Sequence, residues 1–352
     1  MTMHNIGQRT RRARRAFSLI ELLVTMAVIA IVIAIIVPTL GGARNTAKAA
    51  GTQSQLTAIG AAAQQFYSDQ GRLPGYFTAR QMGHTDNEMR GFTGMQNVML
   101  DLAGGIVPDT ASGTNIITVG PLNDASGQVK VDTTLIGTRE AGGGYYTPED
   151  NRFVAQQGAG VGLLVGEDEH QQLRSVVDPF GTPILAWQKD STAIQELEAL
   201  TDFAAPVSNP DEPARFYWAS NAGFLKTQEL GKRGKNPTFA TASTTREYSL
   251  IGDSEPDLSN HMAVLLGSPT IPNEIAPEVP SAARGNLIFH SAGIDAMYMG
   301  SKDTGGRAST LAFWQSFYSD AGGSNRLQDA DGKVESIDLM DRFDDQIETV
   351  GN

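Results

Sequence analysis

The sequence predicts an α+β protein in which one long N-terminal helix precedes a head of short strands and loops. Three observations lead to this class. They are an apolar run at 17–37, a helical apolar stripe that continues to about residue 68, and short strand-like segments among Gly- and Pro-rich stretches. At roughly 100–200 residues per domain, 352 residues allow two domains or one domain with insertions. A hydrophobic content of 40 % is enough for a real core.

The chain begins with a basic leader, residues 1–16, which contains no acidic residue. Its five arginines are Arg9, Arg11, Arg12, Arg14 and Arg15. The formal net charge of the whole chain is −12, so taking away these five positive charges leaves −17 on the rest. Nucleic-acid binders need a basic face, and no nucleic-acid partner is therefore expected. The lack of cysteine excludes disulfides, thiolate zinc sites and cysteine nucleophiles.

Residues 17–37 are long and apolar enough to cross a membrane. The run has 21 residues and one charge, Glu21. A helix of this length reaches about 31 Å, which matches the roughly 30 Å hydrocarbon core of a bilayer. Positive residues stay cytoplasmic, so we expect a cytoplasmic N-terminus and an exported body. Later apolar runs, such as 262–266 and 287–290, are of strand length.

Three interpretations of this segment compete. A cleaved secretory signal has an apolar region of 7–15 residues, and the run here is longer. The triplet 47–49 (AKA) resembles a cleavage site, but it lies beyond the end of the run. A plain signal anchor explains the length and the arginines. It does not explain why the charged Glu21 lies inside the apolar run, or why the run begins at Phe17 directly after the basic leader.

The third interpretation rests on residues 14–23, which read RRAFSLIELL. This stretch resembles the leader and methylation motif of type IV prepilins. The resemblance implies that a prepilin peptidase cuts between Ala16 and Phe17 and that Phe17 is then N-methylated. It also implies that Glu21 serves subunit assembly by pairing with the freed amine of Phe17 in a neighbouring subunit. Ala16 departs from the family, in which Gly usually precedes the cut, so we expect slower processing.

Glu21 has an alternative role that needs no partner. A carboxylate inside a bilayer costs about 2.5–3.5 kcal/mol on insertion scales, and a pairing between subunits would offset much of that cost. Glu21 is also close enough to the helix start for its side chain to extend to the cytoplasmic interface. Both roles are open at this point.

Residues 38–75 are expected to form the second half of the same helix and its exit turn. Pro38 removes one backbone hydrogen bond, and Gly41 and Gly42 weaken the helix further, which predicts a bend at 38–42. The helical pattern then resumes, and its stripe consists of Leu56, Ile59, Ala63 and Phe66. Gly71 as C-cap and Pro74 as a stop predict the end of the helix.

The remaining residues, 76–352, are expected to form an exported globular head. Segments 178–183 (DPFGTP) and 286–295 (NLIFHSAGID) each read as a turn joined to a strand. Together with the exit turn they resemble parts of the major pseudopilins of type II secretion. The resemblance implies a pilin-like fold, with the long helix on a small antiparallel sheet. Residues 76–175 and 188–284 would be loop-rich insertions, with short strands at 116–119, 162–165 and 247–251. Residues 320–352 form an acidic C-terminal segment.

The best metal candidate lies near the C-terminus. Residues 329–333 (DADGK) resemble half of a calcium loop, but Met340 stands where an EF-hand requires Glu. Major pseudopilins bind calcium in a loop near their C-terminus, and this resemblance brings Asp295, Asp329 and Asp331 into view as ligands of a structural calcium ion. The alternative is a turn followed by a solvated acidic segment, whose closing run contains Asp338, Asp341, Asp344 and Asp345.

No enzyme motif stands out: neither an HExxH zinc pattern nor a GxSxG elbow is present. The resemblance implies a structural, non-enzymatic subunit of a type II secretion pseudopilus or type IV pilus-like filament in the inner membrane, with a periplasmic head. Its partners would be the prepilin peptidase, other subunits, an inner-membrane assembly platform and the lipid bilayer. The alternative function is a membrane-anchored periplasmic binding protein or enzyme that carries a prepilin-like signal.

Overall fold

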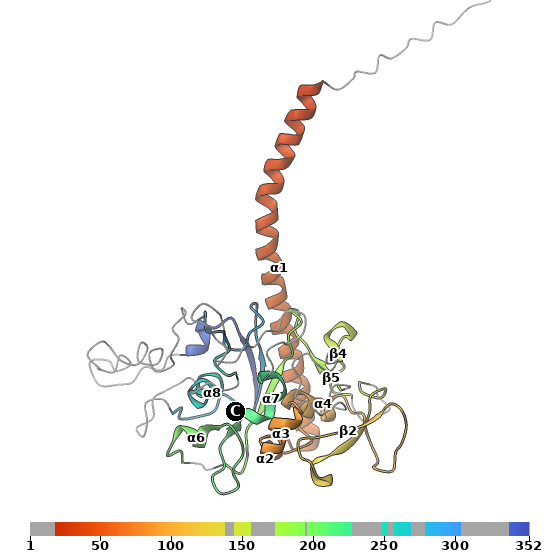
Figure 1. Cartoon of the computed structure of the whole chain (residues 1–352), viewed down its shortest axis with the longest axis vertical. Helices are drawn as coiled ribbons and strands as arrows, with labels where there is room; N and C mark the ends of the chain where they lie inside the picture. The colour runs from red at the N-terminus through yellow and green to blue at the C-terminus, as the bar shows by residue number, and fades with distance from the viewer. Residues whose placement is uncertain are drawn as a thin grey trace, which may run out of the picture. The chain divides into compact units, whose positions relative to one another are not determined.

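A computed structural model of the chain describes residues 18–137, 144–155, 173–193, 196–226, 248–252, 257–268, 279–303 and 338–351. The chain divides into two compact units, Met1–Ala47 and Lys48–Asn352. Helix α1 (Leu19–Gln70) supplies the described part of the first unit and continues into the second, which contains all other elements (Figure 1). The fold is mixed α+β, as the sequence predicts.

Helix α1 runs unbroken from Leu19 to Gln70. It ends at Gly71, whose φ of 71° is left-handed and whose N–H donates to the Tyr67 carbonyl at 2.8 Å. Glycine adopts this conformation without the steric cost that a Cβ brings, so the predicted C-cap is confirmed. The helix assignment continues through Pro38, Gly41 and Gly42, and a bend at this point stays a prediction.

A three-stranded antiparallel sheet lies at the centre of the second unit. Its order is β10-β9-β6, with β6 at Leu185–Gln188, β9 at Leu287–Ser291 and β10 at Gln346–Val350. Successive side chains of a strand point to opposite faces. Ile288 therefore contributes to one hydrophobic core, and its neighbours Leu287 and Phe289 contribute to another. All five residues of β9 are buried, so this strand needs a cover on both faces.

The first face of the sheet is covered by α1 and by α4 (Gly94–Leu102). The predicted stripe of α1 is buried, with Leu56, Ile59 and Ala63 at 0 % exposure. These residues share a core with Met95, Val98 and Met99 of α4 and with Phe289 of the sheet. The stripe therefore faces the sheet, as its spacing predicts.

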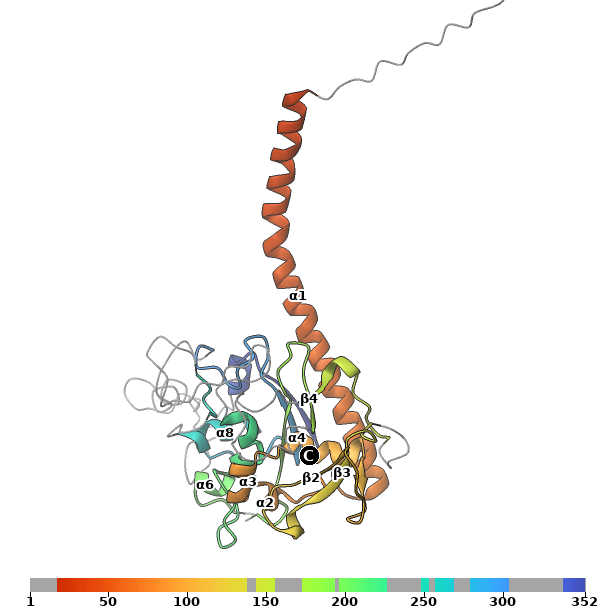
Figure 2. The same ribbon diagram turned by 45° about the vertical axis from the view of Figure 1, so that its right-hand side comes forward.

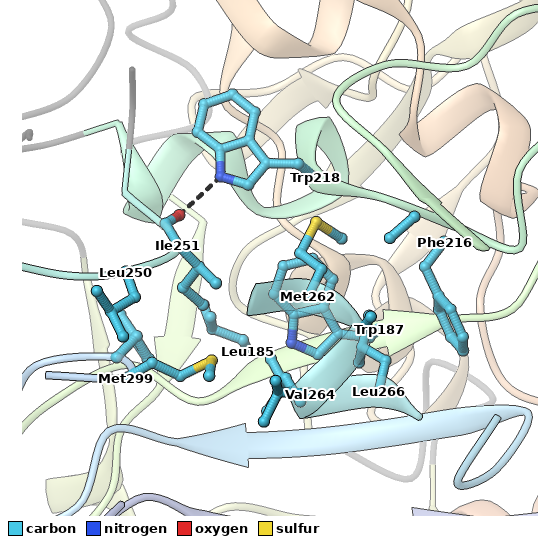
Figure 3. Close-up of a cluster of buried hydrophobic side chains, with 14 of the residues drawn as sticks. Leu185, Trp187, Phe216, Trp218, Leu250, Ile251, Met262, Val264, Leu266 and Met299 are labelled. Atoms are coloured by element: carbon cyan, nitrogen blue, oxygen red, sulfur yellow. Dashed lines mark hydrogen bonds between the residues drawn. The ribbon is translucent and has the colours of Figure 1, made fainter. Parts of the chain in front are cut away.

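The second face is covered by α8 (Leu258–Leu266), with α6 (Leu200–Phe203) and α7 (Ala222–Leu225) nearby. Figure 3 shows Trp187 and Leu185 of the sheet beside Met262, Val264 and Leu266 of α8. The indole N–H of Trp218 donates to the Ile251 carbonyl at 2.9 Å, which satisfies the polar atom of a buried ring. Both segments that the sequence assigns to loop-rich insertions thus build parts of the core.

The other elements surround these layers (Figure 2). A second antiparallel sheet has the order β1-β3-β2; β4 and β5 form an antiparallel pair, and β7 and β8 a parallel one. The bounds are α2 Ala79–Met82, α3 Thr85–Arg90, β1 Ile106–Val107, β2 Ile116–Val119, η1 Ala125–Gly127, β3 Val129–Asp132, η3 Asp150–Arg152, β4 Phe153–Ala155, β5 Arg174–Val176, β7 Ala204–Ala205, β8 Phe216–Tyr217, η4 Trp218–Asn221 and η6 Leu339–Arg342.

The structure confirms some of the short elements that the sequence predicts and corrects others. The strand at 116–119 is confirmed as β2. The strands expected next to the turn at 178–183 and within 286–295 correspond to β6 and β9. The segment 162–165 lies outside the described residues. Within 248–252 the structure has a turn with one isolated bridge, Ser249 to Gly300, instead of a strand. The apolar run 262–266 belongs to helix α8.

Candidate functional site

The first candidate site is the start of α1. The Ser18 hydroxyl accepts a hydrogen bond from the Glu21 backbone N–H at 3.2 Å. In return, Oε2 of Glu21 accepts from the backbone N–H and the hydroxyl of Ser18, both at 3.0 Å. This reciprocal pair is a capping box, which satisfies donors at the helix start. The signature Ser-x-x-Glu is present in the sequence at 18–21, but the sequence analysis missed it.

Glu21 therefore has a local role that does not depend on any neighbouring subunit. Ala16 and Phe17 lie outside the described residues, so the cleavage and methylation site stays a prediction. The pairing of Glu21 with the amine of Phe17 in another subunit also stays a prediction.

Among the described residues, α1 is the one helix that is long and apolar enough to cross a membrane, judged by length and composition. Its large apolar side chains between residues 19 and 37 are exposed, from 45 % for Ile36 to 83 % for Leu19. A continuous apolar surface of this kind marks contact with a membrane or a partner. The carboxylate of Glu21 stands at its N-terminal end.

The second candidate site is a carboxylate cluster in the second unit. One carboxylate oxygen each of Asp295, Asp303 and Asp344 lies within 4.8 Å of the others. Pairing of β9 with β10 explains why these carboxylates lie together, because Ser291 at the end of β9 pairs with Gln346 at the start of β10. The antiparallel register thereby brings the loop after β9 next to the residues before β10.

Backbone donors hold this loop in place around two carboxylates. Oδ2 of Asp344 accepts from the N–H groups of Ile294 at 2.7 Å and Asp295 at 3.0 Å. Oδ1 of Asp345 accepts from the Met299 N–H at 2.9 Å and contacts Nε2 of His290. The side chains of His290 and Asp345 are both fully buried. The second oxygens, Oδ1 of Asp344 and Oδ2 of Asp345, are buried and have no hydrogen-bond partner.

The loop has an unusual backbone. Gly293 has a φ of 65°, and a Cβ at this position would lie 2.2 Å from the backbone oxygen of Asp344. Two non-glycine residues, Ala296 and Met299, also have positive φ values of 62° and 49°. Such residues are uncommon and cluster where the surrounding structure imposes a conformation, often at a ligand site.

The charges of the cluster oppose one another. Burial of its carboxyl group and the neighbouring charge of Asp344 raise the pKa of Asp295 to about 8. The residue as a whole is exposed to solvent, and its carboxylate belongs to the cluster. Burial and the charge of Asp345 raise the pKa of Asp344 to about 6, against the effect of its backbone hydrogen bonds. A bound cation would favour the charged forms.

The carboxylate oxygens of this cluster are the kind of ligand that a hard cation prefers. Ca²⁺ prefers oxygen ligands, often from several carboxylates, and within the cluster Oδ1 of Asp344 is a buried oxygen without a hydrogen-bond partner. Of the three residues that the sequence brings into view, Asp295 belongs to this cluster, and Asp329 and Asp331 lie outside the described residues. The sequence analysis missed Asp303 altogether and saw Asp344 only as part of an acidic run. Asp338 from the same run instead pairs with Arg284.

Comparison with known proteins identifies the N-terminal segment. Residues 11–37 match the model of the prokaryotic N-terminal methylation motif, which is less than a tenth of the chain. The chain thus carries a type IV prepilin-type signal. No curated protein and no solved structure matches it significantly. The resemblance of the head to major pseudopilins stays a prediction.

Proposed function

We propose that the chain is a structural subunit of a type II secretion pseudopilus or a type IV pilus-like filament. The prepilin peptidase cuts between Ala16 and Phe17, Phe17 is N-methylated, and α1 then joins the helices of other subunits. The observation that carries the proposal is the methylation-motif match at 11–37. It is supported by the exposed apolar surface of α1 beyond Ser18, which bundled helices or lipid would cover. The inner membrane anchors the subunit before assembly, and the head lies in the periplasm.

The processing step is tested by intact mass and N-terminal sequencing of the membrane-extracted protein, with and without the peptidase. We expect a methylated Phe17 start that depends on the peptidase. A start near Ala50 or an intact Met1 would overturn the proposal. It would favour an ordinary exported or anchored protein, in which the head binds a ligand or catalyses a reaction.

Two roles of Glu21, helix capping and charge pairing, are separated by matched substitutions. Glu21→Gln keeps the capping geometry, because Gln also serves in a capping box, but it removes the charge. If assembly depends on pairing with the Phe17 amine, Glu21→Gln and Glu21→Ala both abolish filaments and leave membrane insertion intact. Ser18→Ala removes the cap and keeps the charge, so filaments should persist. If the Glu21→Gln variant forms filaments and the Ser18→Ala variant forms none, assembly depends on the helix cap and not on charge pairing.

The carboxylate cluster is proposed as a structural calcium site formed by Asp295, Asp303 and Asp344. Bound calcium would neutralise the repulsion among these carboxylates and link the loop after β9 to the residues before β10. It would stabilise the head, and no catalytic step is assigned to it. Isothermal titration of the chelator-treated full chain with Ca²⁺ tests the site. Asp303→Asn should weaken binding, and unchanged binding would exclude this ligand set.

A further inference from the structure

The largest cavity recorded in the described part of the chain shares no residue with the two candidate sites above. Its volume is about 800 Å³, and it lies between the exit turn of α1, residues 71–77, and the segment that follows β6. Pockets of roughly 300–1,000 Å³ are the size that encloses a small ligand. The side chains that line this pocket indicate which class of ligand it suits.

The first wall of the pocket is the exit turn, which α4 holds in place. Asp101 of α4 forms a bidentate pair with Arg72, at 2.7 and 2.9 Å, and accepts from the Gly75 N–H at 2.7 Å. The side chain of Asn97 accepts from the Phe77 N–H at 2.8 Å and donates to the Phe77 carbonyl at 2.9 Å. This wall therefore has a fixed shape before any ligand binds.

The second wall is the segment after β6, which its own polar contacts hold in place. Oδ1 of Asp190 accepts from the N–H and the hydroxyl of Thr192 at 2.8 and 2.6 Å, and Oδ2 accepts from the Tyr217 hydroxyl at 2.9 Å. Arg80 of α2 donates to Oγ1 of Thr192 at 2.7 Å and so links the two walls. A preformed pocket avoids the entropic cost of ordering its walls around a ligand.

Two tyrosines present aromatic surface to this pocket. Tyr67, in the last turn of α1, and Tyr76, in the exit turn, both line it, and each is 46 % exposed. The ring of Tyr76 packs edge-on against Phe77, with centroids 5.0 Å apart, which fixes its position. Exposed aromatic rings at the wall of a pocket offer flat faces on which a ligand can stack.

The polar part of the lining consists largely of groups that both donate and accept hydrogen bonds. The amides of Gln188 and Asn286 and the hydroxyl of Ser191 line the pocket, and each group has both functions. The aliphatic side chains in the lining are few and small: Leu73, Ala79 and Ala193. A purely apolar ligand therefore finds little surface to pack against apart from the two tyrosine rings.

We propose that this pocket binds a short oligosaccharide whose pyranose rings stack on Tyr67 and Tyr76. A pyranose ring has C–H groups on its faces, which suit the negative face of an aromatic ring, and hydroxyls around its rim. Those hydroxyls also both donate and accept, so they match Gln188, Ser191 and Asn286. The inference does not depend on filament assembly.

The test measures fluorescence anisotropy with the full chain in micelles of a detergent that has no sugar headgroup, because such a headgroup would compete for the pocket. The probes are labelled chitotetraose and labelled cellotetraose, which present the two faces of their rings in different chemical settings. Sorbitol is the matched competitor, because it has the hydroxyls of a sugar and no ring. We expect at least one of the two sugars to bind and sorbitol not to displace it.

Matched variants assign the binding to the pocket. Tyr67→Ala should weaken it about fivefold or more, since the stacking face is lost, whereas Tyr67→Phe keeps the ring and should change it less than about twofold. Alanine suits an exposed helical position, so the fold should persist. Met89→Ala is the control, because Met89 is 59 % exposed and does not line the pocket. Thermal melts verify folding of each variant.

The proposal is overturned if neither sugar binds, if sorbitol competes as well as the free sugar, or if Tyr67→Ala loses no more affinity than Met89→Ala. It is also overturned if adenosine monophosphate displaces the sugar at lower concentration than the free sugar does, because base stacking and phosphate charge would then account for the pocket. Preference for chitotetraose indicates a glycan with acetamido groups. Preference for cellotetraose indicates a glucan without them.

Discussion

Asp295 and Asp344 are expected to lower the stability of the metal-free chain as the pH rises. An ordinary Asp has a pKa of about 3.9, and these two have values raised to about 8 and about 6. Between the ordinary and the raised values the folded chain holds protons that the unfolded chain has released. The contribution of these two residues to the free energy of unfolding therefore decreases as the pH rises from about 4 to about 8. The buried His261, whose pKa burial lowers to about 3, acts in the opposite direction up to about pH 6.5.

Melting temperatures in chelator at about pH 5 and about pH 8 measure this effect, and the value at pH 8 should be lower. Asp295→Asn should flatten the difference, whereas the exposed Asp150→Asn should leave it unchanged. Calcium should raise the melting temperature more at pH 8, where its ligands are ionised. A chain that is equally stable at both pH values would contradict the proposed repulsion.

Gly293 packs tightly against the backbone of Asp344 in the carboxylate cluster. Gly293→Ala would place a Cβ 2.2 Å from the backbone oxygen of Asp344, in a left-handed conformation. We expect a loss of stability of more than about 2 kcal/mol, since backbone strain and a clash add together. Gly181→Ala is a matched control, because Gly181 also has a positive φ, 91°, and its Cβ would meet nothing within 4 Å. Urea denaturation compares the two; equal losses would mean that φ alone determines the cost.

At the scale of elements, Gly41 and Gly42 have no packing reason to be glycine in the described part of the chain. A Cβ at either position would meet nothing within 4 Å. Replacing both with Ala should favour the helix by about 0.8–1 kcal/mol each. Hydrogen exchange of the chain in micelles should then slow at residues 38–46. The same change at Gly60 is a contrasting control, because its Cβ would lie 3.0 Å from the Glu348 side chain.

If a soft point in α1 aids exit from the membrane, the double Ala variant also assembles more slowly than the native chain. Faster exchange at residues 38–46 in the variant would contradict the idea that the glycines loosen this part of the helix.

Local patterns predicted several elements well. The stripe from Leu56 to Phe66 and the C-cap at Gly71 depend on residues close in sequence, and α1 follows both. The run 262–266 was ambiguous, because five apolar residues fit a strand or one side of a short helix equally well. Only the neighbouring sheet, whose second face α8 covers, decides between them. The capping box at Ser18 and Glu21 was visible in sequence and was overlooked.

At the scale of the whole molecule, the carboxylate cluster shows what a single sequence does not contain. Asp295 was found through a resemblance. Asp303 lies in the same loop after β9, and Asp344 joins the two because β10 pairs with β9. The spacing of the three residues along the chain does not reveal the register between β9 and β10. A site of this kind forms only when segments distant in sequence pack together, and the local sequence pattern does not predict it.

The C-terminal strand connects the end of the chain to α1. All five residues of β10 pair with β9, and Val350 is buried in the core that contains Leu56 and Ile59. Glu348 accepts from Gln53 at 3.3 Å and from Thr57 at 3.4 Å on α1. The strand thus joins the sheet to the helix that covers it.

Removing residues 346–352 should therefore destabilise the whole head. The truncated chain keeps Asp344 and Asp345, but β9 loses one partner strand and the core loses Val350, a combined cost of several kcal/mol. We expect loss of the cooperative thermal transition in near-ultraviolet circular dichroism and rapid proteolysis. Glu348→Gln is the control: it keeps the strand and changes only the two exposed contacts with Gln53 and Thr57 of α1, so its melting temperature should shift little. A cooperative transition in the truncated chain would mean that α1, α4 and α8 hold β6 and β9 together without the third strand.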